Sequence, residues 1–179
     1  MSYHNIDVNT DLQIPYKLIH IHQNLGDKFM NSTFEFRIRC LDGNQTEESI
    51  KYGGITASFD VILDSSSIKA SIVSKVTVGN VYKFYKELKQ AYEKLEGNAE
   101  LKEYGAEPRT NITVTFEKNG KCSIKGYIRE VDYMIDLGAY RGIDINIICD
   151  QSYFNDALWN FKVLFEELAK IQGVSNFQY

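Results

Sequence analysis

Two histidines at a spacing of two residues, His20 and His22, are the first group in this sequence that could do chemistry. They lie in a segment, residues 12–23, that can form an edge strand after Pro15, and residues i and i+2 of a strand share one face. Two imidazoles at that spacing can share a metal ion. Zinc takes three or four ligands, however, and no further His or paired Cys stands near them in the sequence. We therefore interpret them as ordinary strand histidines and expect no metal site and no cofactor.

A cysteine beside an acid, Cys149–Asp150, could begin a nucleophilic site if a histidine joined it. Cys149, however, ends an apolar alternation that begins at Ile143, which is typical of a buried strand residue. Asp150 stands where a helix N-cap is expected, with Ser152 as a second candidate for that role. The motifs GxSxG, HExxH, GxGxxG and the P-loop do not occur. The sequence therefore predicts no catalytic residue, and we expect the chain to act by binding rather than as an enzyme.

Acidic segments with tyrosines between the acids are the feature of the sequence that most favours a binding function. Such segments could dock onto a basic protein surface by electrostatic steering and aromatic anchoring. Surface loops are also often charged only because they are solvated, and that interpretation stays open. The candidates for partner binding are Glu100, Glu103, Tyr104, Asp132, Tyr133 and Asp136.

The length, composition and cysteine content of the chain limit the classes of protein to which it can belong. The chain has 179 residues, 44% of them hydrophobic, which predicts a single domain over residues 1–179, with residues 1–11 loosely ordered. The formal net charge of −4 gives no sign of the basic surface that grips nucleic acid. The three cysteines form no CxxC pair, the sequence opens without a signal peptide, and no stretch approaches the ~20 apolar residues of a membrane span. We therefore expect a cytoplasmic protein that contacts neither membrane nor nucleic acid directly.

Apolar periodicity predicts the elements that must position these residues. Strand-like alternation occurs over residues 33–40, 55–63, 68–72, 112–116, 122–128 and 143–149, and amphipathic helices are expected over 80–96 and 153–171. An irregular acidic linker is expected over 96–108. The predicted class is α+β, with antiparallel meanders of six to seven strands in the order βββαβββα, covered by two helices.

Two hairpin registers can be predicted from the same alternation. A four-residue loop sets Leu63 opposite Ile68 on the apolar face of the first hairpin. In the second hairpin, a three-residue loop with Gly120 in the left-handed conformation sets Phe116 opposite Cys122.

Three stretches of the sequence also carry a resemblance to a known family. These are LEGNAEL (95–101) at the end of the expected helix, TNITVTFEKNGKCSIKGYI (110–128), and DINIICDQSYFNDAL (144–158). Their order over about residues 57–171 resembles the WapI-type immunity proteins of bacterial contact-dependent toxin systems, while residues 1–54 fall outside the resemblance. The resemblance implies a small cytoplasmic protein that binds and neutralises a cognate toxin domain, often a nuclease. Because such proteins recognise their partners through variable surfaces, no binding residue can be transferred.

Two other functions remain open at this point. A small-molecule-binding protein or hydrolase would need polar residues that converge only in the fold, and a pocket holding a histidine and two acids would support it. A structural or assembly module would show a large exposed apolar patch.

Overall fold

Two antiparallel sheets and two helices make up the part of the chain that the structure describes. The structure is a computed structural model, and it describes residues 6–7, 17–24, 31–42, 54–64, 69–103, 108–131 and 140–170. Its elements are β1 (Ile6–Asp7), β2 (Lys17–Asn24), β3 (Asn31–Asp42), β4 (Thr56–Asp64), β5 (Lys69–Thr77), α3 (Val78–Lys94), β6 (Gly97–Lys102), β7 (Thr110–Phe116), β8 (Lys121–Val131), β9 (Tyr140–Asp150) and α4 (Tyr153–Leu168).

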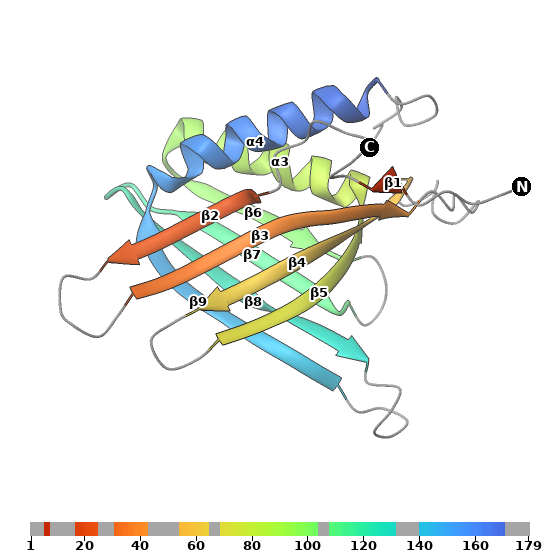
Figure 1. The fold of residues 1–179 in the computed structure, drawn as a ribbon. Coiled ribbons are helices and arrows are strands. Elements are labelled where there is room, and N and C mark those ends of the chain that lie inside the picture. The colour runs from red at the N-terminus through yellow and green to blue at the C-terminus, as the bar shows by residue number, and fades with distance from the viewer. Residues whose placement is uncertain are drawn as a thin grey trace, which may run out of the picture.

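The first sheet is built around β3, which pairs with β2 and the short β1 along one edge and with β4 along the other, and β5 pairs with β4. The second sheet is the meander β6-β7-β8-β9. Figure 1 shows one sheet in front of the other, with both helices lying across the upper edges of the two sheets. The predicted α+β class, with antiparallel meanders and two helices, is confirmed.

The core lies between the sheets because their apolar side chains alternate with polar ones. Along β7, Ile112, Val114 and Phe116 are buried, and the residues between them are partly exposed. Aromatic side chains join the helices to this core. Phe116 meets Phe154 of α4 edge-on at 5.1 Å between ring centroids, and Phe84 of α3 meets Phe161 of α4 at 5.8 Å. The two sheets and both helices therefore share one apolar interior.

Both helices form where the periodicity predicts them, with small shifts at their ends. The helix α3 begins two residues earlier than expected because Thr77 is its N-cap, with the Thr77 hydroxyl accepting a hydrogen bond from the Asn80 backbone N–H at 3.2 Å. It ends at Lys94, and the C-cap residue Leu95 adopts a left-handed conformation with φ 55°. The helix α4 buries the predicted apolar face, including Phe154, Phe161 and Leu168.

The second hairpin has the predicted register, with Phe116 opposite Cys122. Gly120 has a φ of +81°, and its N–H donates to the Glu117 carbonyl oxygen at 3.0 Å, as expected for a turn closed by a left-handed glycine. Gly126 lies where the strands approach closely: a Cβ atom there would be 2.0 Å from the Asn111 carbonyl oxygen. Only glycine fits that position.

Two expectations about the elements are wrong. The predicted linker over 96–108 contains β6, whose short alternation of buried Ala99 and Leu101 is easily overlooked among acids. In the first hairpin, Leu63 lies opposite Ala70 rather than Ile68. That shift keeps the same side chains on the apolar face, so alternation cannot distinguish the two registers. Apart from the two-residue β1, which pairs with residues 40 and 41 of β3, the described elements follow the order ββββαββββα, with one more strand in each half than expected.

Candidate functional site

The structure places two of the six predicted partner-binding residues, Glu100 and Glu103, on and just after β6. Glu100 is exposed, and its backbone N–H donates to the Glu87 carboxylate of α3 at 3.0 Å. The Glu103 carboxylate accepts from the Arg109 backbone N–H at 2.7 Å, so this side chain fixes the two ends of the connection between β6 and β7. Tyr104, Asp132, Tyr133 and Asp136 lie outside the described residues.

Charge is unevenly divided between the described framework and the segments that join its elements. The whole chain holds 20 Lys and Arg against 24 Asp and Glu. The described residues contain 18 of the former and 17 of the latter, and the remaining segments contain 2 and 7. The framework is therefore close to neutral, and the acidic excess of the protein belongs to the other segments.

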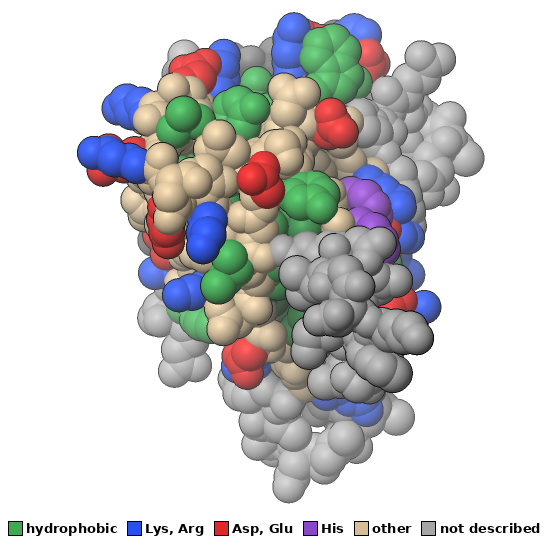
Figure 2. Space-filling model, turned by 90° about the vertical axis from the view of Figure 1, so that its left-hand side faces the viewer, with side chains coloured by type: hydrophobic (Ala, Val, Ile, Leu, Met, Phe, Trp, Pro, Cys, Tyr) green, Lys and Arg blue, Asp and Glu red, His purple; other side chains and the backbone are tan. Residues whose placement is uncertain are grey.

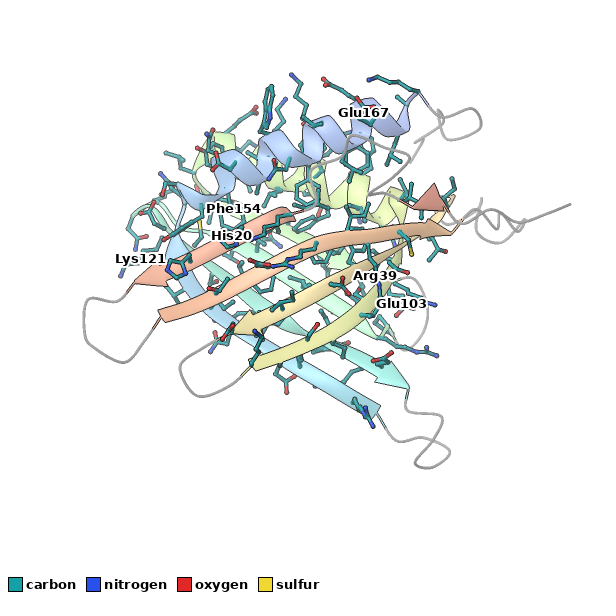
Figure 3. The ribbon with its side chains drawn as sticks, in the orientation of Figure 1. His20, Arg39, Glu103, Lys121, Phe154 and Glu167 are labelled. Atoms are coloured by element: carbon teal, nitrogen blue, oxygen red, sulfur yellow. The ribbon has the colours of Figure 1, made fainter. Side chains whose placement is uncertain are left out.

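Five of those seven acids belong to three connections that leave from the same end of the two sheets. The connections are 43–53, 104–107 and 132–139, and the acids are Glu47, Glu48, Glu107, Asp132 and Asp136. Hydrogen bonds hold the strand ends together there: Val78 N–H to the Ile55 carbonyl oxygen at 2.7 Å, and the Asn80 amide to the Lys102 carbonyl oxygen at 2.8 Å. Figure 3 labels Glu103 at this end and Lys121 at the opposite end.

Arg129 organises the outward face of the second sheet near the same end. Its guanidinium pairs with the Asp144 carboxylate at 2.6 Å, donates to the Ile143 carbonyl oxygen at 3.1 Å and lies 5.1 Å from the centroid of the Tyr127 ring. The alternation of apolar and polar residues in the sequence gave no sign of the partnership between Arg129 and Asp144. The one available signal was Gly142, opposite Arg129 in β9, where the missing side chain leaves room for the arginine.

A buried carboxylate on the outward face of the first sheet is the feature that sequence reasoning missed entirely. Only 6% of the Glu35 side chain is exposed. One carboxylate oxygen lies 2.8 Å from Lys17 Nζ and 3.0 Å from His20 Nδ1, and the other pairs with the Arg37 guanidinium. Three basic neighbours offset the cost of removing this charge from water. The sequence contained no local signal for the burial of Glu35, since two of its partners, Lys17 and His20, come from β2.

The side chains of His20 and His22 are both exposed, and each imidazole contacts a residue of β3 through its Nδ1 atom. His20 Nδ1 faces Glu35, and His22 Nδ1 lies 3.1 Å from the Thr33 hydroxyl. Burial, followed by the charge of Lys17, lowers the pKa of His20, so the neutral imidazole is favoured. Figure 2 shows histidine side chains at the molecular surface beside Lys or Arg side chains.

The cysteines lack the setting of a nucleophile. Cys122 and Cys149 lie opposite each other on β8 and β9, and burial raises the pKa of each thiol to about 12. The prediction that Cys149 is a buried strand residue is confirmed; Cys122 is buried as well, and Cys40 is partly exposed. The neighbouring Asp150 accepts from the Ser152 N–H at 2.8 Å, and this hydrogen bond lowers the pKa of the Asp150 carboxyl. Asp150 therefore fixes the entry to α4 rather than assisting a thiol.

Three large apolar side chains are exposed in the described part of the chain: Leu95, Ile148 and Trp159. They belong to the end of α3, the edge strand β9 and the outward face of α4. The Trp159 side chain is 61% exposed, and the Lys162 ammonium lies over its ring, 5.2 Å from the ring centroid. A tryptophan in such a position is typical of a contact residue, although single exposed apolar side chains are also common.

Within the described ranges, no group of three or more His, Cys, Asp or Glu side chains could hold a metal ion, and no helix there is long and apolar enough to cross a membrane. Comparisons with protein-family models, curated proteins and solved structures give no significant match.

Proposed function

We propose that this chain is a non-enzymatic binding protein, and specifically a bacterial immunity protein that neutralises a cognate toxin domain in the cytoplasm by occluding it. The observation that carries the proposal is the division of charge: a nearly neutral framework with its acidic excess in the joining segments. Complementary charge steers association and selects partners. The motif order over about residues 57–171 adds toxin neutralisation as the purpose of that binding.

A toxin that cleaves nucleic acid suits this charge distribution. Such an enzyme needs a basic surface to hold phosphates. Acids on three connections from one end of the framework can compete for that surface, which would occlude the substrate site without any chemistry by the inhibitor. In this proposal Glu103 has a supporting role, because its carboxylate is already engaged with the Arg109 N–H.

A charge-reversal experiment with a matched control tests the proposed surface. The test variant carries Glu100→Lys, Asp132→Lys and Asp136→Lys, and the control carries Glu93→Lys, Asp156→Lys and Glu166→Lys on the helices. Affinity for the toxin domain encoded next to this protein is then measured at two salt concentrations. We expect the test variant to bind at least roughly tenfold more weakly, chiefly through slower association, and the control to bind like the unmodified chain. Equal losses in both variants would remove this surface from the proposal.

The alternative function, a hydrolase or small-molecule-binding protein, is favoured by one observation, the His20–Glu35 pair. A carboxylate that holds one nitrogen of a neutral imidazole leaves the other nitrogen for proton transfer. The two functions differ in their response to His20→Ala. A hydrolase would lose turnover of its substrate, whereas the binding proposal predicts no turnover in either protein and full protection against the toxin by both.

A further inference from the structure

His20 and His22 share a geometry that their spacing alone did not reveal. Both project from the exposed face of β2, with Ile19 and Ile21 buried on the other face. Each imidazole contacts the residue directly opposite it on β3, Glu35 for His20 and Thr33 for His22. Both contacts use the Nδ1 atom. The part of the chain that the structure describes offers the two Nε2 atoms no hydrogen bond or ion pair, so both are available there for a ligand.

Fixing Nδ1 is what the surroundings of a metal-binding histidine usually do. A carboxylate or another polar group that holds one ring nitrogen sets the tautomer and makes the other nitrogen a better ligand. Two residues along a strand separate the histidines by about 6.6 Å, and metal–nitrogen bonds of about 2.0 Å bring two rings within reach of one ion after a small tilt.

We propose that His20 and His22 bind a divalent transition-metal ion through their Nε2 atoms, with Glu35 and Thr33 holding the two rings in place. Imidazole ligands select ions such as Zn²⁺, Ni²⁺ or Cu²⁺ over Mg²⁺ and Ca²⁺. Two protein ligands leave further positions on the ion for water or for a group from a binding partner. The site is independent of the proposed immunity function.

The local charges make a specific prediction about affinity. Lys17 lies 2.8 Å from Glu35, and Arg37 pairs with the same carboxylate, so the surroundings carry one more positive than negative charge. A bound dication is repelled by that excess, and the site is expected to be weak. Removing the Lys17 charge should strengthen it, an effect opposite to that of most substitutions near a binding site.

Zinc titration of the full-length chain tests the site. The protein is prepared without a polyhistidine tag and with His4→Ala, so that His20 and His22 are its only histidines, since the chain contains three. Isothermal titration calorimetry with zinc chloride should show one ion per chain. His20→Ala and His22→Ala should each weaken zinc binding at least tenfold, Lys17→Met should strengthen it severalfold, and Thr33→Val should weaken it while Thr33→Ser retains it.

Two results would overturn the proposal. One is the absence of zinc binding by the His4→Ala protein at millimolar zinc. The other is binding that survives in the variant lacking both His20 and His22. Circular dichroism of each variant separates loss of the site from loss of the fold, and absorption of bound Co²⁺ reports nitrogen ligation independently of the calorimetry.

Discussion

Arg129 crosses the edge strand β9 directly over Gly142, and a Cβ atom at residue 142 would lie 2.4 Å from Arg129 Cδ. The crossing brings the guanidinium to the Ile143 carbonyl oxygen and to Asp144 on the far side of the glycine. The missing side chain at Gly142 thus leaves room for the path that the Arg129 side chain takes to Asp144.

The substitution Gly142→Ala should displace Arg129, because a flexible side chain yields more readily than a backbone. We expect a loss of about 1 kcal/mol in the free energy of unfolding, the net scale of one hydrogen bond, because the ion pair with the largely exposed Asp144 adds little. In an Arg129→Met background, Gly142→Ala should lower the free energy of unfolding by much less. Urea unfolding of the unmodified chain, the two single variants and the double variant gives the coupling energy between the two positions. A coupling energy near zero would show that the crossing does not stabilise the fold.

The substitution Gly126→Ala should be far more damaging than Gly142→Ala. A Cβ atom at 126 would meet backbone, 2.0 Å from the Asn111 carbonyl oxygen, and the φ of +153° is itself unfavourable for alanine. We expect a loss of about 3 kcal/mol or more. Gly54→Ala is the matched control, since Gly54 also has a positive φ but no atom within 4 Å of the added Cβ. Similar losses of thermal stability at the two sites would contradict the close approach at Gly126.

A hydroxyl pair joins the two sheets where both are buried. The Ser74 and Thr110 side-chain oxygens lie 2.8 Å apart, with each residue 1% exposed. Ser74→Ala should cost about 1–2 kcal/mol, because the Thr110 hydroxyl loses its partner in a dry setting. The double variant Ser74→Ala, Thr110→Val should lose less free energy of unfolding than the two single variants lose together. Additive losses in urea unfolding would mean that the two hydroxyls do not interact.

Buried thiols should make the fold sensitive to alkali. Burial raises the pKa of Cys122 and Cys149 to about 12 from the ordinary 9.0. Because the folded pKa is the higher one, this contribution to stability is complete below pH 9 and is lost as the pH rises toward 12. The free energy of unfolding should therefore fall with pH above 9, and the fall should be shallower in a Cys122→Ala, Cys149→Ala double variant. Identical slopes would show that the thiols ionise equally in both states.

Local sequence patterns predicted the features that neighbouring residues determine, such as a hairpin register and a buried helix face. They did not predict the contacts between segments that are distant in the sequence. The register that sets Phe116 opposite Cys122 follows from alternation and one glycine, and the buried face of α4 follows from helical spacing. The strand β6 was missed because only Ala99 and Leu101 alternate there. The Glu35 cluster could not be predicted, since the burial of an acid depends on which strand brings Lys17 and His20 to it.

The measurement that tests the proposed function most directly is co-purification of this chain with the polypeptide encoded beside it, followed by a toxicity assay of that polypeptide. The proposal predicts a stoichiometric complex, sensitive to salt, in which the neighbour is no longer toxic. Failure of the two well-folded proteins to associate, or a complex in which the neighbour remains toxic, would contradict it.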